Sequence, residues 1–254
     1  IRIPLNFNSP YKAVNIIDFW KRWHMTLSQF LRDYLYIPLG GNRVGRQRRY
    51  INLMITMLLG GLWHGAGWTF VLWGGLHGAY LVINHAWRTL MGRLGWAGGD
   101  SVAARWASRL LTFTCVVVGW VFFRSAGLDA ARAMLVSMAG LGGVPVPSVV
   151  PAGLVAGLNA VLPVDITHGA ALANGLIPPV TFAWLALLFV VAWGCPNAIE
   201  LFARYRPVAG RVFAPRAAGL RWFPAPAWAL VGLVAFVYAL LRLSAISEFL
   251  YFQF

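Results

Sequence analysis

Residues 60–67 read Gly60-Gly-Leu-Trp-His64-Gly-Ala-Gly67, which places one histidine among glycines in the middle of a long apolar tract. The tract begins near Tyr50 and ends near Trp87. A fully charged side chain at membrane depth costs roughly 2.5–3.5 kcal/mol, and a neutral imidazole, although cheaper, still requires a partner or a water-filled cavity. Because the flanking glycines carry no side chains, backbone or substrate can approach His64 closely. This run is therefore the best candidate for a reactive centre.

The composition is that of an integral membrane protein. Of the 254 residues, 59% are apolar and 11% are charged, whereas soluble domains carry about 25% charged residues. Several long runs are almost free of charge, which predicts transmembrane helices. The net charge of +14 does not indicate a nucleic-acid partner, because the arginines lie in short loops between apolar segments. That placement is typical of cytoplasmic loops that face anionic membrane lipids.

The segment from Ile16 to Tyr36 has the period of one amphipathic helix, with apolar residues on one face and charged residues on the other. The apolar face collects Ile16, Trp20, Trp23, Leu27, Phe30, Leu31 and Tyr34. A tryptophan-rich helix of this kind is expected in the membrane interface rather than across it. His24 projects onto the apolar arc, where a packed core histidine is the more common interpretation.

A turn at Pro38–Asn42 ends this predicted helix, and Arg43, Arg46, Arg48 and Arg49 follow it. The bias of arginine toward cytoplasmic loops is the simpler explanation of these charges. The alternative is that they bind the phosphates of a nucleotide-bearing donor. Asn42 and Arg43 are accordingly candidate substrate-binding or supporting residues.

Five apolar segments are expected to form helices in the membrane: Tyr50–Trp63, Trp68–Trp87, Ala107–Phe123, Pro179–Pro196 and Ala227–Leu241. The first is short for a span and runs into glycines, which fits a broken or re-entrant helix that lines a cavity. His77 is expected mainly to pack inside the second. Leu128–Leu141 is expected to be a short surface helix. Arginine content predicts that loops 21–49, 88–109 and 200–225 face the cytoplasm, with 125–177 and the C-terminus outside.

The motifs of several enzyme classes are absent from the sequence. There is no P-loop, no GxSxG, no HExxH and no Cys/His cluster, and the seven acidic residues are scattered, so neither a metal site nor a carboxylate dyad is expected. Histidine chemistry remains. With an unperturbed pKa of about 6.5, His64 can take a proton from a hydroxyl at neutral pH, and His24 could orient substrate or polarise a carbonyl.

Three stretches closely resemble the membrane-bound O-acyltransferase (MBOAT) superfamily: Trp23-His24-Met-Thr-Leu27, Arg32-Asp-Tyr-Leu-Tyr-Ile-Pro-Leu-Gly-Gly-Asn-Arg43 and Gly61-Leu-Trp-His64-Gly65. Within it they are similar to the bacterial polysaccharide branch typified by the alginate O-acetyltransferase subunit AlgI, which also shares the terminal Phe249–Phe254. The dense matching covers residues 1–87 and the last seven. The resemblance implies an all-α polytopic MBOAT-like bundle with interfacial and broken or re-entrant helices.

Family members are roughly twice as long, so the resemblance implies that residues 1–254 are the C-terminal part of a single MBOAT-type membrane domain. Residues 1–49 would supply the interfacial helix and basic loop, residues 50–87 the catalytic histidine segment, and residues 88–254 further transmembrane helices. His64 matches the catalytic histidine, the position of His24 is also implicated, and Trp63 and His77 are candidate supporting residues.

The resemblance also implies an O-acetyltransferase of the bacterial inner membrane that binds no cofactor and uses acetyl-CoA or another acyl donor as a substrate. Its acceptor would be an exported polysaccharide such as alginate, and a periplasmic acetyltransferase would be its partner. Three alternatives stay open: D-alanyl transfer to a cell-wall polymer, a transporter or channel gated by the broken helix, and an inactive scaffold subunit. A transporter would more often show buried carboxylates in its spans.

Overall fold

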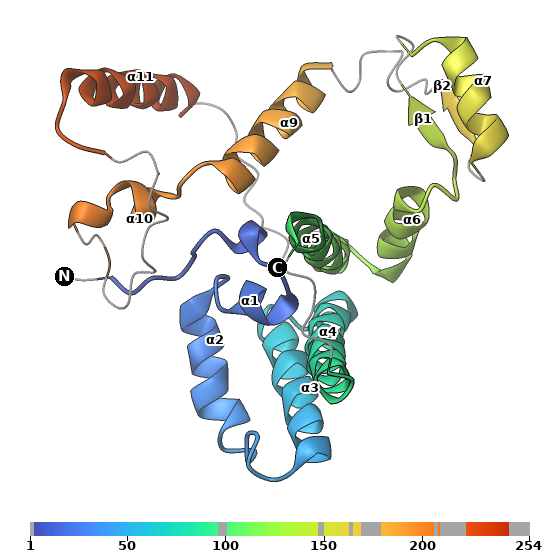
Figure 1. Ribbon diagram of the computed structural model, residues 1–254, viewed down its shortest axis with the longest axis vertical. Coiled ribbons are helices and arrows are strands. Elements are labelled where there is room, and N and C mark those ends of the chain that lie inside the picture. The colour runs from blue at the N-terminus through green and yellow to red at the C-terminus, as the bar shows by residue number, and fades with distance from the viewer. Residues whose placement is uncertain are drawn as a thin grey trace. The chain divides into compact units, whose positions relative to one another are not determined.

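The computed structural model describes residues 3–95, 101–146, 150–162, 165–168, 179–205, 208 and 222–243 (Figure 1). Two compact units make up the chain, one from Ser9 to Gly194 and one that joins residues 1–8 to residues 195–254. The described structure is mostly helical, as expected. It departs from an all-α fold in one place, where β1 (Val144–Val146) pairs in parallel with β2 (Ile166–His168). The side chain of Asn159 stabilises this pair by hydrogen-bonding the backbone N–H and C=O of Ile166 at 2.7 and 2.9 Å.

The expected continuous helix from Ile16 to Tyr36 is wrong. A short 3-10 turn, η1 (Pro10–Lys12), leads into α1 (Ile16–Trp20), which the side chain of Asn15 caps by accepting a hydrogen bond from the Asp18 N–H. The chain then breaks, because His24 adopts left-handed backbone angles (φ 44°, ψ 52°) that no right-handed helix can accommodate. A second helix, α2 (Met25–Leu31), starts after it.

A π-helical turn, η2 (Arg32–Tyr36), follows α2, and the loop after it is fastened by Asn52. The Asn52 side chain is fully buried and donates hydrogen bonds to the carbonyl oxygens of Leu39 and Gly41 at 3.0 and 3.1 Å. Since Gly40 and Gly41 both have positive φ angles, glycine is required in this turn. The turn thereby delivers the chain to α3 (Arg46–Trp63).

Helices α3 and α4 (Trp68–Arg93) form a closely packed hairpin, seen side by side in Figure 1. Glycines at the crossing make this approach possible. A methyl group built on Gly61 would collide with the carbonyl oxygen of Phe70, and one built on Gly74 would collide with that of Met57. The two expected apolar segments are confirmed as helices, and both extend beyond the expected ends into their arginine-bearing flanks.

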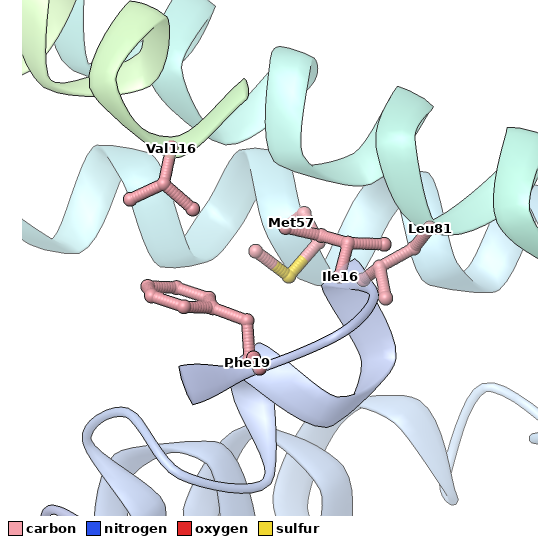
Figure 2. Close-up of a cluster of buried hydrophobic side chains, with 6 residues drawn as sticks. Ile16, Phe19, Met57, Leu81 and Val116 are labelled. Atoms are coloured by element: carbon pink, nitrogen blue, oxygen red, sulfur yellow. The ribbon is translucent and has the colours of Figure 1, made fainter. Parts of the chain in front are cut away.

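The hydrophobic core of this unit lies where α1 meets α3, α4 and α5 (Val102–Arg124). Figure 2 shows the side chains that converge there, among them Ile16, Phe19, Met57, Leu81 and Val116. Within the described residues, α5 is the one helix long and apolar enough to cross a membrane. The expected spans at the C-terminal side are confirmed as shorter apolar helices, α9 (Pro179–Gly194) and α11 (Pro226–Arg242). The expectation of five crossings stays a prediction.

The remaining elements are short. The surface helix expected at Leu128–Leu141 is confirmed as α6 (Leu128–Met138), whereas α7 (Ala152–Val161) lies in a segment for which no helix was predicted. The second unit holds α10 (Ala198–Leu201) and η3 (Ala203–Tyr205). Within that unit, the Asn197 side chain donates a hydrogen bond to the Asn8 side chain at 3.0 Å. The C-terminal motif Phe249–Phe254 lies outside the described residues.

Candidate functional site

His64 lies at the tip of the α3–α4 hairpin. It caps the C-terminal end of α3, where its backbone N–H donates to the Gly61 carbonyl at 3.0 Å and that of Gly65 donates to Leu62 at 3.1 Å. The chain reverses within four residues before α4 begins at Trp68. The imidazole is therefore held by a short, hydrogen-bonded connection between two tightly packed helices, and it is half-buried.

Aromatic rings from three helices surround the His64 imidazole. Trp63 contacts it at a centroid distance of 4.9 Å, Trp73 of α4 at 5.2 Å, and Phe123 of α5 at 4.9 Å, all with their rings nearly perpendicular to it. Phe70 stacks at 6.4 Å. The described part of the chain holds two ion pairs, Asp18–Arg22 and Arg32–Asp33, and neither includes this histidine. Its environment is thus aromatic rather than that of a histidine–carboxylate pair.

The backbone break at His24 brings a second imidazole to the same place. The His24 ring meets the indole of Trp63 edge-on at a centroid distance of 6.5 Å. The same indole also contacts the His64 ring, at 4.9 Å. The Trp63 side chain is 62% exposed, so it remains accessible beside both imidazoles. The structure therefore brings together His24, Trp63 and His64, all three of which the sequence had proposed as site residues.

Both imidazoles favour the neutral form. Burial lowers the pKa of His24, against a smaller opposing effect of a backbone hydrogen bond. Burial also lowers the pKa of His64, in the connection between the helices, and the nearby positive charge of a protonated His24 lowers it further. A pKa below the usual 6.5 keeps an imidazole unprotonated at neutral pH. A neutral imidazole is the form that can accept a proton from a substrate hydroxyl.

His77 lies one aromatic ring away from this pair. Its side chain is 1% exposed and contacts Trp73 at 4.9 Å and Trp20 at 5.3 Å. Since Trp73 also contacts His64, His64 and His77 share one indole. His77 reaches no surface and lies behind the aromatic wall of the site.

Asn42 and Arg43 are not brought to His64. Both are exposed and precede α3, whose opposite end carries His64. A helix of 18 residues is about 27 Å long at a rise of roughly 1.5 Å per residue. These two residues therefore belong to the basic end of the hairpin, with Arg46, Arg48 and Arg49, and not to the histidine site.

The sequence did not indicate Phe70, Trp73 or Phe123 as neighbours of His64. Phe123 comes from α5, and nothing local in the sequence connects it with the hairpin. For Trp73, the available signal was a glycine in each of two consecutive apolar segments, Gly61 and Gly74. Where two such glycines meet, their contact fixes which residues of α4 lie beside the end of α3.

Comparison with known proteins adds independent information. A family model described as MBOAT, membrane-bound O-acyltransferase family, matches residues 2–118. The chain is 39% identical over 256 residues to a Pseudomonas putida protein named probable alginate O-acetylase AlgI, covering 98% of this chain and 46% of that protein. It is 51% identical over 144 residues to the peptidoglycan O-acetyltransferase of Helicobacter pylori, covering 57% of this chain and 26% of that protein.

A more distant relative is the teichoic acid D-alanyltransferase of Streptococcus thermophilus, 38% identical over 94 residues, which cover 34% of this chain and 23% of that protein. The chain spans less than half the length of each of these relatives. The family match includes α1 to α4 and most of α5, and thus contains His24, Trp63, His64 and His77. With its site segment matched by the family model and nearly all of its length aligned to an AlgI-like relative, this chain belongs to the membrane-bound O-acyltransferase family.

Proposed function

We propose that the protein is a multi-pass O-acyltransferase of the bacterial inner membrane that moves acetyl groups toward hydroxyls of an exported polysaccharide, with His64 as the general base. The observation that carries this proposal is the contact of both imidazoles, His24 and His64, with Trp63, inside the segment that matches the family. The names of the relatives, an alginate O-acetylase and a peptidoglycan O-acetyltransferase, support a polysaccharide acceptor.

The proposed reaction is acyl transfer from a thioester such as acetyl-CoA to a sugar hydroxyl. His64 takes the hydroxyl proton while the hydroxyl oxygen attacks the acyl carbon, so that a C–O bond forms and the C–S bond breaks. The imidazolium then returns the proton to the leaving thiolate, and no external oxidant or reductant is needed. A positioned general base of this kind contributes about 10²–10⁴ in rate.

His24 is proposed to orient the substrate or polarise the acyl carbonyl, and Trp63 to position substrate between the two imidazoles. His24 is well placed for this, because it contacts the same indole as His64 yet lies on another segment of the chain. The exposed indole of Trp63 offers a flat apolar surface beside both rings.

D-alanyl transfer to teichoic acid is the second candidate, and the relative of that name in Streptococcus thermophilus favours it. The same histidine chemistry would serve both reactions, since each moves an acyl group to a hydroxyl. The two differ in donor and acceptor, which the histidine site does not distinguish. A periplasmic acetyltransferase that completes the transfer is proposed as a partner of the first candidate.

Radiolabelled transfer in membranes tests these proposals. Membranes that contain the full-length protein are given [¹⁴C]acetyl-CoA with alginate, peptidoglycan or teichoic acid as acceptor, and, in a parallel arm, a D-alanyl thioester. Label in an acetylated polysaccharide that disappears in His64→Gln supports the proposal. Label transferred only from the D-alanyl donor would favour the second candidate.

A further inference from the structure

His77 is a buried polar residue whose placement packing alone does not explain. It is the largest of the fully buried side chains among the described residues, with 1% of its surface exposed. Both ring nitrogens are buried, and neither makes a hydrogen bond within the described structure. Leaving buried polar atoms unpaired is unfavourable, so an apolar ring of similar size would serve packing better.

On one side, His77 is connected to the proposed base, His64, through Trp73. Its ring contacts the indole of Trp73 at 4.9 Å, and that indole meets His64 nearly perpendicularly at 5.2 Å. Trp73 is itself buried, so its position depends on the residues that pack around it. A change in the volume or shape of residue 77 would therefore be transmitted to the wall of the His64 site.

On its other side, His77 contacts the end of α1, the helix that precedes His24. Its ring contacts Trp20 at 5.3 Å and Phe19 at 6.2 Å, which are the last two residues of α1. The backbone break that orients His24 begins directly after this helix. His77 thus lies between the element that carries His64 and the element that leads to His24.

A glycine on α5 fits this arrangement. A Cβ atom at Gly119 would lie 2.8 Å from Nε2 of His77 and 3.5 Å from Cδ1 of Trp73. Without a side chain at Gly119, α5 can approach α4 closely at His77. One helical turn further along α5, Phe123 contacts both His64 and Trp73. The packing of His77 against Gly119 therefore also sets where Phe123 lies.

We propose that His77 is a positioning residue that holds Trp73, Phe123 and the end of α1 so that His64 and His24 keep their relative placement. His77 touches no reacting atom. This inference rests on the function proposed above for His64. It differs from plain packing in one respect: a disturbance at residue 77 changes the chemical step in molecules that are fully folded.

The test compares purified full-length variants in detergent, with kcat and KM for acetyl transfer expressed per folded molecule. His77→Asn removes the ring contacts, and Gly119→Ala presses on the unchanged ring. Both are expected to lower kcat about tenfold with KM nearly unchanged, because displacements of about 1 Å from changes remote from the chemistry can cost up to 10²-fold. Gly75→Ala is the matched control, since its added methyl group meets only Leu58 at 3.5 Å, an ordinary contact.

Two further measurements separate the possible outcomes. Combining His77→Asn with Trp73→Phe is expected to give a non-additive loss in kcat, which distinguishes positioning from independent packing. Loss of folded protein in His77→Asn and Gly119→Ala, with an unchanged kcat for the folded fraction, would overturn the positioning role. A His64→Gln variant that retains full activity would instead remove the proposed function itself, whatever the His77 variants do.

Discussion

Gly61 and Gly74 face each other across the α3–α4 crossing so closely that a methyl group on either would meet backbone atoms of the other helix. This contact fixes the distance between the helices one turn below His64. It also fixes the register of α4, and hence which of its aromatic residues reaches the imidazole. The reactive centre therefore depends on backbone proximity that only glycine permits.

Gly74→Ala should accordingly destabilise the protein. Overpacking in a tight contact costs about 1–3 kcal/mol, and here the added methyl group meets a backbone carbonyl that cannot rotate away. Gly75→Ala, one position further, should be neutral or slightly stabilising, because alanine is favoured over glycine in helices by up to about 1 kcal/mol. Thermal unfolding of both variants in one detergent checks the difference. Equal melting temperatures would contradict the close crossing.

The left-handed backbone at His24 gives a prediction whose sign is informative. Glycine adopts this conformation freely, whereas an L-residue pays roughly 1–2 kcal/mol. His24→Gly should therefore be more stable than His24→Ala by about 1 kcal/mol, although both variants lose the imidazole equally. In a continuous helix the order would be reversed, by about the same amount. The free energy of unfolding of the two variants distinguishes the break from an uninterrupted helix.

Much of the fold follows from hydrophobic runs, and the break at His24 shows where that reasoning ends. Apolar length alone located α4, α5, α9 and α11, since nothing competes with burial in such segments. Both sides of His24 are amphipathic in the same phase, and no Gly or Pro marks the change, so the sequence reads as one helix. Hydrophobic periodicity does not record a single left-handed residue such as His24.

For the candidate site, the sequence indicated the main residues but not the contacts between them. His64 stands out because glycines surround it, and His24 stands out through the family motif. Their meeting on Trp63 depends on the break before α2, and Phe123 reaches His64 only through the packing of α5 on α4. Asn52 was missed because an asparagine within an apolar helix has no distinctive spacing. Its role became evident only from its two hydrogen bonds to the loop before α3.

The arginine-rich segments 43–49 and 204–221 are predicted to face the cytoplasm, on the basis of positive charge. Single cysteines at Arg46 and Arg211, in a background that lacks Cys115 and Cys195, would report this with a membrane-impermeant maleimide. We expect labelling only after the inner membrane is opened. Strong labelling of both positions from the periplasmic side of intact cells would overturn the topology.

The rate of acyl transfer should fall in acid. Since burial and the charge of His24 hold the pKa of His64 below 6.5, the imidazole is neutral at pH 7 and becomes protonated only as the pH falls through that lowered value. Protonation removes the base, so the acid limb of kcat/KM should lie below pH 6.5. The reference value is that of an unperturbed imidazole, about 6.5.

His24→Gln should move this limb to higher pH. Removing His24 removes a positive charge that opposes protonation of His64, so the pKa of His64 rises toward its ordinary value. Lys21→Gln serves as a control, because it removes an exposed charge from the same turn without changing either imidazole. An acid limb that stays in place or moves to lower pH in His24→Gln would contradict the coupling of the two histidines.

The sharpest prediction concerns His64 itself. His64→Gln keeps polarity and approximate size but cannot take up the proton, so transfer should fall by roughly 10²-fold or more. The full-length variant should still insert and accumulate normally, because His64 lies in a half-buried turn whose hydrogen bonds are made by the backbone. Radiolabelled transfer, normalised to the folded protein in the membrane, measures the loss.

Substitution of His24 or His77 is expected to reduce the rate of acyl transfer less than substitution of His64. His77→Gln should lower the rate only about tenfold, because that residue acts through Trp73 and Phe123 rather than on the substrate. His24→Gln should fall between them, since orienting a substrate contributes less than the proton transfer. A well-folded His64→Gln protein that acetylates at nearly the wild-type rate would rule out the general-base mechanism. Failure of His64→Gln to fold would instead assign His64 a structural role at the hairpin tip, where four aromatic rings pack around it.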